Sequence, residues 1–359
     1  MRYGVMVLED YYADAHGSVA GLYQRLIERA VEAEQLGYAG FWMAEHHFHW
    51  YGGAHSVPLV ALSAIAARTS TLRLGTAVTL LPYYNPMRVA EELACLDNLS
   101  NGRVDVGVGR GFFKIEYDGY EVPMDQSRGR FDENLDILLQ AWSDERLTYH
   151  GQYHTYDQME LTPRPVQQPH PPVWVATSLT PESYIAVGKR GLPLMVVPYI
   201  QTSLDDLRTN IDLYREAYAQ AGHPGQPEIF AFMHAFVTDS DDHLKDQIDR
   251  YLTRYVDAIR EAEGRMRGER PEVQYGYFKG LMAGLAYVTF DIMDSGDKAF
   301  FGTPQRCAET LRRVRDKLGL TYLAILPSFG GLPEADVRRT IRLWQEQVAP
   351  VAERGLQAV

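Results

Sequence analysis

The feature that most constrains the fold is a regular alternation of short apolar runs with longer stretches of helical periodicity. The apolar runs have the length and composition of buried strands, and they lie at 3–8, 40–44, 72–80, 104–108, 173–176, 194–197, 229–237 and 322–326. Helical spacing of apolar residues follows or separates them at 22–33, 58–67, 86–101, 131–142, 181–189, 204–221, 243–262 and 304–318. Nearly continuous apolar strands indicate a parallel sheet covered by helices. Eight strands and eight helices predict a (β/α)8 barrel, with an open doubly wound sheet as the alternative.

Two segments interrupt this alternation, and we expect them to be insertions in a single domain that spans 1–359. Segment 149–172 is rich in Tyr, His, Pro and Gln, which predicts a surface hairpin followed by an extended approach to the fifth strand. Segment 264–301 begins with a charged, glycine-containing run and continues with aromatic and small residues. Long insertions in barrel loops are commonly lids or linkers. We expect this one to be a lid.

Composition excludes several classes of protein. The formal net charge of −12 argues against binding to duplex nucleic acid, which requires a concentrated basic face. No apolar run approaches the ~18 residues needed to span a bilayer, and no secretory signal precedes the first strand. Two cysteines, Cys95 and Cys307, cannot form a disulfide framework. We therefore expect a cytoplasmic protein with no membrane or nucleic-acid partner.

Histidines cluster directly after the second predicted strand. Active sites of (β/α)8 barrels lie at the carboxyl ends of the strands, and here Glu45, His46, His47 and His49 fall within five residues. A metal site is one interpretation. It is disfavoured because neighbours on an extended segment point in opposite directions and no H-E-x-x-H spacing is present. Two interpretations remain: a histidine with a structural role, and a histidine whose imidazole exchanges protons with a ligand. We favour the proton-exchanging role.

Three donor-rich clusters follow other strands or begin helices. They are 107–111 with Arg110, 127–130 with Arg128, and 176–180 with its hydroxyl side chains. Glycines allow a ligand to approach the backbone, and arginines and helix starts attract anions. Each cluster alone is better explained by helix capping or, for the arginines, by a solvated face. Together, on one rim of an acidic protein, they predict a bound phosphate group.

Small residues end the third predicted strand and leave room for a flat ring. These small residues are 75–78. Aromatic side chains nearby could line the same space, and the alternative is that they only pack inside the barrel. The aromatic candidates for the ring site are Trp42, Phe48, Tyr83 and Tyr84. For a substrate pocket we expect Trp42, His47 and Tyr51, with Tyr275 and Phe278 from the lid. These side chains predict a largely apolar small-molecule substrate.

Four motifs, in this order and spacing, resemble the bacterial luciferase-like monooxygenases. They are FWMAEHHF, RLGTAVTLLPYYNPMRVAEELACLDNLSNGR, VGVGRGF and SRGRFDENLDILLQAW, and the likeness continues more loosely to about residue 315. The resemblance implies a (β/α)8 barrel that takes reduced FMN from a separate flavin reductase. Oxygen then adds at the flavin C4a position, and the peroxide oxidises an organic substrate.

The resemblance also implies roles for individual residues. His46 matches the catalytic histidine, and Gly109 stands where luciferase has a reactive cysteine, which argues against light emission but not against oxygenation. Arg110, Arg128 and Ser178 match phosphate-binding residues, and Ala77-Val78 matches a non-proline cis peptide under the flavin ring. The cofactor-binding residues we expect are therefore Ala77, Val78, Arg110, Arg128, Thr177 and Ser178.

Other functions remain open at this point. Within the superfamily, a deazaflavin-dependent hydride-transfer enzyme is the nearest alternative, followed by a non-catalytic flavin-binding subunit. A metal-dependent hydrolase is a third, although we predict no metal. The family is commonly dimeric through the helices at 58–67 and 89–99, so we expect a homodimer.

Overall fold

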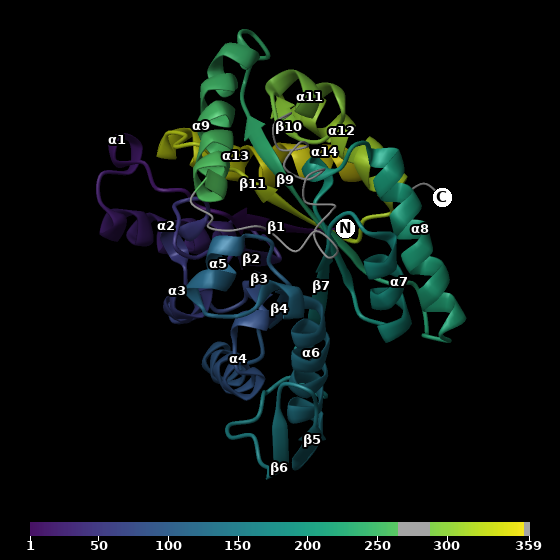
Figure 1. Cartoon of the computed structure of the whole chain (residues 1–359). Coiled ribbons are helices and arrows are strands. Elements are labelled where there is room, and N and C mark those ends of the chain that lie inside the picture. Colours follow the sequence, from purple (N-terminus) through teal and green to yellow (C-terminus); the bar gives the residue numbers. More distant parts are fainter. Residues whose placement is uncertain (265–287, 355–359) are drawn as a thin grey trace.

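Eight parallel strands close into a barrel in the computed structural model, which describes residues 1–264 and 288–354 (Figure 1). The barrel strands are β1 (Arg2–Val7), β2 (Gly40–Met43), β3 (Arg73–Leu80), β4 (Val104–Gly109), β7 (Val173–Thr177), β8 (Leu194–Val196), β9 (Ile229–Val237) and β11 (Tyr322–Leu326). They pair in sequence from β1 to β9, and β11 pairs with both β9 and β1. No barrel strand is left as an edge, so the predicted (β/α)8 barrel is confirmed and the open sheet is excluded.

Helices surround this barrel at all eight predicted positions. They are α2 (Val19–Gln35), α3 (Pro58–Ala66), α4 (Pro86–Ser100), α6 (Ser127–Ser143), α7 (Pro181–Arg190), α8 (Leu204–Gln220), α9 (Leu244–Gly264) and α12 (Pro304–Leu318). The predicted set of helices was nevertheless incomplete, because α9 and α12 both lie between β9 and β11, as predicted, which left the last strand without a helix after it. The helix that follows β11, α13 (Glu334–Leu343), was not predicted, and α14 (Ala349–Glu353) continues it. Within the described part of the chain, no helix is both long and apolar enough to cross a bilayer.

Local sequence explains where α4 begins and ends. Asn85 caps its start, because the side-chain oxygen accepts hydrogen bonds from the backbone N–H groups of Met87 and Arg88. Pro86 occupies the first turn, where a missing N–H costs nothing. Asn101 then ends the helix in the left-handed conformation at φ 56°, and Gly102 follows at φ 81°. The start of α4 is thereby fixed directly after β3.

Large aromatic side chains fill the barrel interior. Trp42 stacks on Phe230 with ring centroids 4.6 Å apart, and its indole N–H donates to the Tyr322 hydroxyl at 3.0 Å. Gly75 makes room for this indole, since a Cβ there would lie 2.1 Å from the Trp42 ring. Trp42 is therefore a core residue below the site. The structure does not place it in the predicted substrate pocket, because the side chain is fully buried among these rings and does not line the cavity described below.

The two insertions, 149–172 and 264–301, lie in different halves of the sequence. The first contains the antiparallel hairpin of β5 (Leu147–His150) and β6 (Thr155–Met159), which confirms the predicted hairpin and lies beside α6 at the bottom of Figure 1. The second contains α11 (Phe290–Ser295) and the short strand β10 (Phe300–Gly302), which pairs with the end of β9. The predicted lid residues Tyr275 and Phe278 lie outside the described residues.

Candidate functional site

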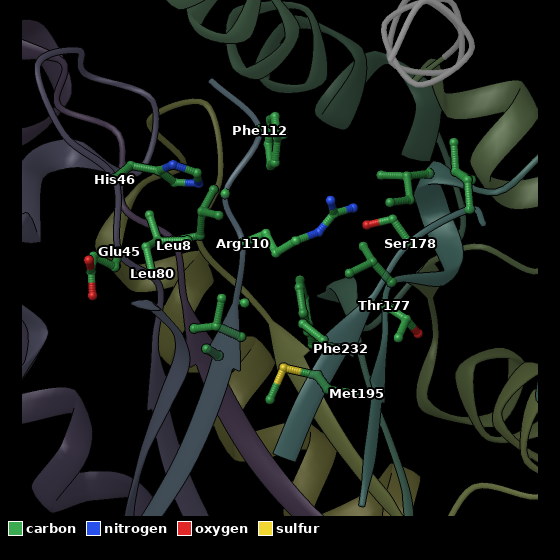
Figure 2. Close-up of a pocket in the computed structure, with 18 of the residues that line it drawn as sticks. Leu8, Glu45, His46, Leu80, Arg110, Phe112, Thr177, Ser178, Met195 and Phe232 are labelled. Atoms are coloured by element: carbon green, nitrogen blue, oxygen red, sulfur yellow. The ribbon is translucent and has the colours of Figure 1, made fainter. Parts of the chain in front are cut away.

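A cavity lies at the carboxyl ends of the barrel strands, where the loops after them meet (Figure 2). It encloses about 1100 Å³ of empty space, part of it open to solvent. Most of its lining is apolar and includes Leu8, Leu80, Phe112, Met195, Val197 and Phe232. A smaller hollow of about 440 Å³ adjoins it and shares Arg110, Ala176, Thr177 and Ser183 with it. The site is therefore a mainly apolar chamber joined to a hollow with charged side chains in its lining, Arg110, Arg128, Asp132 and Arg190, which we call the polar branch.

Cationic and hydroxyl side chains gather at the polar branch. Arg110, just after β4, lines both spaces, and in Figure 2 its guanidinium group points toward the Ser178 hydroxyl. Arg128, in the first turn of α6, lines the smaller hollow. The Thr177 hydroxyl is buried and makes no hydrogen bond within the described residues. Of the predicted cofactor-binding residues, Arg110, Arg128 and Thr177 line this hollow and Ser178 lines the chamber beside it. The Asp132 carboxylate and the Arg190 guanidinium also line the hollow, so its arginines outnumber its carboxylate three to one and could hold an anion.

Small residues form one wall of the larger chamber. Ala77 and Val78 line it, and the peptide bond between them is cis, as predicted. Gly109, on the neighbouring strand β4, lies directly beside it, because a Cβ there would come within 2.5 Å of Val78 Cγ2. Any side chain at position 109 would therefore press on this wall. The wall offers a smooth surface to a flat ligand.

His46 enters the chamber from the loop after β2 and is held by a buried carboxylate. Its Nδ1 lies 2.9 Å from Glu116 Oε1, in the short helix α5 (Lys114–Gly119). An ionised carboxylate only accepts hydrogen bonds, so Nδ1 carries the proton and Nε2 is the nitrogen left for other partners. In Figure 2 the imidazole points into the cavity. This is the geometry of an imidazole prepared to exchange a proton with a ligand.

Glu116 is the anchor of this arrangement. Its carboxylate also accepts the backbone N–H of His47 at 3.0 Å and the Tyr83 hydroxyl at 3.1 Å. Complete burial would raise the pKa of this carboxyl group, but the imidazoles of His46 and His49 outweigh that effect and hold the pKa at about 2. Glu116 is therefore ionised throughout the neutral range. It favours the proton on His46 Nδ1 and fixes the orientation of the ring.

His46, His49 and Glu116 also form a cluster with metal-ligand chemistry. One ligand atom from each lies within 4.8 Å of the others. The argument that histidines on this segment would not converge therefore fails for His46 and His49. The chain reverses at Phe48, whose φ is 67°, and this turn brings the two imidazoles to the same side. Glu116 Oε1 lies 2.9 Å from His46 Nδ1, a hydrogen bond, and 3.3 Å from His49 Nε2, a close contact without hydrogen-bond geometry. The carboxylate charge therefore lies beside both imidazoles.

Comparison with known proteins identifies the family. The sequence profile of the luciferase-like monooxygenases matches residues 1–322. The chain belongs to this family. A relative is the oxygenase component of the flavin-dependent trigonelline monooxygenase of Acinetobacter baylyi, 28% identical over 67% of this chain and 66% of that protein.

Solved structures agree on the fold of this luciferase-like protein. The monooxygenase RslO1 of Streptomyces bottropensis superposes with a TM-score of 0.85 at 29% identity, covering 98% of this chain and 99% of that one. The oxygenating constituent of 3,6-diketocamphane monooxygenase of Pseudomonas putida, solved with FMN, gives 0.79 at 18% identity, with 98% of each chain covered. An F420-dependent secondary alcohol dehydrogenase gives 0.73 at 21%, again covering 98% of each.

Not every residue predicted for the pocket of this luciferase-like protein lies there. Tyr51 lines the chamber, but His47 lines neither of the two spaces described above. Its Nε2 is 3.1 Å from Glu45 Oε1, and its Nδ1 is 3.0 Å from the Tyr120 hydroxyl. Both nitrogens are thus engaged away from the chamber, and in Figure 2 the Glu45 carboxylate also points away from it. The prediction of His47 as a pocket residue is wrong because adjacent side chains on this loop face opposite ways.

The most important residue missed from the sequence is Glu116. It lies in a six-residue helix that has too few turns to show periodicity, among other charged residues. The one available signal was its position six residues after Arg110, in the loop that follows β4. Nothing in the sequence indicated that this loop would fold back against the loop after β2.

Proposed function

We propose that this chain is the oxygenase component of a flavin-dependent monooxygenase that uses reduced FMN from a separate reductase and O2 to oxidise a largely apolar small molecule. The observation that carries the proposal is one continuous site with an anion-binding branch at one end and the His46–Glu116 pair at the other. An apolar chamber of this kind binds uncharged organic molecules and limits the access of water.

The residues of the branch fit the phosphate of FMN. Arg110 and Arg128 supply charge-assisted donors, and the Thr177 hydroxyl is a buried group whose hydrogen bond a phosphate oxygen would complete. The flat wall of Ala77 and Val78 fits a planar ring system. Bound reduced FMN would supply the electrons and activate O2. The chain's own residues bind it, orient it and exclude water.

His46 then handles protons at the reacting end. With Nδ1–H held by Glu116, the imidazole Nε2 can take a proton from the substrate or return one to a developing oxygen anion. The buried carboxylate stabilises the imidazolium that forms when Nε2 is protonated. A subunit that merely bound flavin would not need this pair, so the pair favours a catalytic chain over a non-catalytic one.

Ligand titration combined with oxygen kinetics tests the proposal. Oxidised FMN, reduced FMN and reduced deazaflavin F420 are titrated separately, and each reduced complex is then mixed with O2 in a stopped-flow instrument. We expect saturable binding of FMN and reoxidation kinetics that differ from those of free reduced FMN. Binding of F420 without binding of FMN would instead support the hydride-transfer alternative, which the fold also permits.

We also propose that the chain forms a homodimer through α3 and α4. Three large apolar side chains on and just before these helices are exposed: Val57, Val60 and Leu99, at 54, 69 and 68%. An exposed apolar surface of this kind is typical of an interface between subunits. Light scattering on the native chain is expected to give twice the 40.7 kDa of one chain, and Val60→Glu is expected to shift the mass toward the monomer.

A further inference from the structure

Three buried tyrosines meet behind the chamber and form a short hydrogen-bonded relay. Tyr255 on α9 lies at its centre, with its hydroxyl oxygen 3.0 Å from that of Tyr51 and 3.2 Å from that of Tyr199. Tyr51 and Tyr199 line the chamber, whereas Tyr255 is fully buried behind them. Neither the phosphate branch nor the His46–Glu116 pair accounts for these three hydroxyl groups.

The three hydroxyl groups of this tyrosine relay have one more proton than their two mutual hydrogen bonds use. Each phenol has one O–H to donate and can accept from a neighbour. The two hydrogen bonds of the relay use two of its three protons. When Tyr255 donates one of these bonds, the remaining proton belongs to Tyr51 or Tyr199, the two tyrosines that line the chamber. Hydrogen bonds in such a chain polarise one another, so the outer O–H is a stronger donor than an isolated phenol.

The surroundings keep the relay uncharged. Burial, reinforced by the neighbouring phenols, raises the pKa of Tyr51 and of Tyr255 well above the usual value of 10. His234 on β9 packs edge-on against Tyr199 and Tyr255, with ring centroids 4.6 and 4.9 Å away. Burial lowers the pKa of this histidine to about 3, so it is a neutral neighbour. The relay therefore offers a neutral O–H to a ligand and does not act as a base.

Tyr51 is the end of the relay nearest to the chemistry. Its ring centroid is 5.0 Å from that of His46, and both rings line the chamber. Resting on the proposed function, we infer that Tyr51, supported by Tyr255 and Tyr199, donates a hydrogen bond to the oxygen of a carbonyl-containing apolar substrate and holds that carbonyl beside His46. Tyr51 is the binding residue, and Tyr255 acts through it as a positioning residue.

Two probes that differ only in the oxygen test this inference. 4′-Fluoroacetophenone has C=O where 4-fluoro-α-methylstyrene has C=CH2, and ¹⁹F NMR titration gives the Kd of each. We expect Tyr51→Phe to lower the ketone-to-alkene affinity ratio about fivefold, the effect of one neutral hydrogen bond. Tyr255→Phe is expected to lower it about twofold, since Tyr51 then keeps its O–H but loses its support. Tyr214→Phe, another fully buried helical tyrosine, is the matched control and is expected to leave the ratio unchanged.

Infrared spectroscopy of the ¹³C=O-labelled ketone supplies a second measurement that a general loss of packing would not imitate. A donated hydrogen bond lowers the carbonyl stretching frequency, and the shift is expected to disappear in Tyr51→Phe and to shrink in Tyr255→Phe. Equal weakening of both probes in Tyr51→Phe, or an unchanged carbonyl frequency, would overturn the inference.

The same titrations on the FMN-free and the FMN-saturated protein separate the two proposals. Absence of FMN binding would refute the proposed function, whereas the probe ratio in the FMN-free protein would still test the tyrosine relay.

Discussion

The two ends of the site are built in different ways. At the polar branch, arginines and hydroxyl groups from β4, α6 and β7 surround a hollow, and the Thr177 hydroxyl there makes no hydrogen bond within the described chain. At the other end, the Glu116 carboxylate accepts hydrogen bonds from both His46 and Tyr83 inside the protein. On the proposed function, a ligand would complete the first end, whereas the second is already organised by hydrogen bonds within the protein. Substitutions at the branch should therefore change affinity, and substitutions at the His46 end should change rate.

Loss of the imidazole is expected to have the largest effect. His46→Ala removes the group that exchanges protons at the reacting end, so the rate of substrate oxidation should fall about 100-fold or more. The Kd for FMN should change little, because His46 lies away from the polar branch. Single-turnover kinetics and FMN titration measure the two quantities, and free imidazole should restore part of the rate. A large loss of FMN affinity with an unchanged rate would reverse the proposed division of the site.

Removal of an arginine from the polar branch is expected to lower the affinity for FMN rather than the rate of oxidation. Arg110→Ala and Arg128→Ala should each weaken FMN binding about 10- to 100-fold through the loss of a charge-assisted hydrogen bond. Arg130 is the matched control, because it lies two residues from Arg128 but packs over the Tyr153 ring and does not line the hollow. Isothermal titration calorimetry with FMN measures the effect, and an equal loss in Arg130→Ala would show that net charge alone is responsible.

A carboxyl group just beyond β1, near the His46 loop, makes the stability of the folded protein depend on pH. Asp10 accepts a hydrogen bond from Gly52 N–H at 2.9 Å, and burial raises the pKa of Asp10 to about 7. Because the folded protein holds this proton up to about pH 7 while an unfolded Asp loses it near 3.9, stability falls as pH rises through that window.

The Asp10→Asn variant has no ionisable group at this position, so it does not lose stability in this way as the pH rises. It should raise Tm by about 2 °C or more at pH 8 relative to the native chain, with a smaller gain at pH 5. Scanning calorimetry at both pH values measures this, with the exposed Asp239→Asn as control. A gain that is equal at both pH values would refute the raised pKa.

Chelation is expected to have the smallest effect. If the His46–Glu116 hydrogen bond and packing hold His46, His49 and Glu116 together without an ion, the purified protein should contain no stoichiometric metal, and EDTA should change neither Tm nor oxidation rate. Elemental analysis and a chelator series test this. One bound equivalent of metal that is lost in His49→Ala would instead support a metal centre.

The sequence was most informative where a pattern repeats and least informative where distant loops meet. Apolar runs such as 229–237 and helix signals such as Pro86 reflect local physics, so the eight barrel strands and their order were predictable. Arg110 and Arg128 were found because glycines and family motifs surround them. The partnership of His46 with Glu116, 70 residues apart, depends on how two loops fold against each other, and no local pattern encodes it. Trp42 was misplaced because an aromatic residue at a strand end has the same sequence signature whether it faces a cavity or the barrel core.

The contact between Phe48 and Gly119 has a mechanical consequence. Phe48 takes the left-handed conformation between His46 and His49, and its ring covers Gly119 so closely that a Cβ there would lie 2.2 Å away. Gly119 ends the same short helix that carries Glu116. The loop that contains Phe48 and the helix α5 are therefore packed against each other at this contact. A displacement of either segment would also displace the other, so the two imidazoles and the Glu116 carboxylate would move together. A bulky side chain at position 119 would shift both segments as one body, without touching any group that meets the ligand.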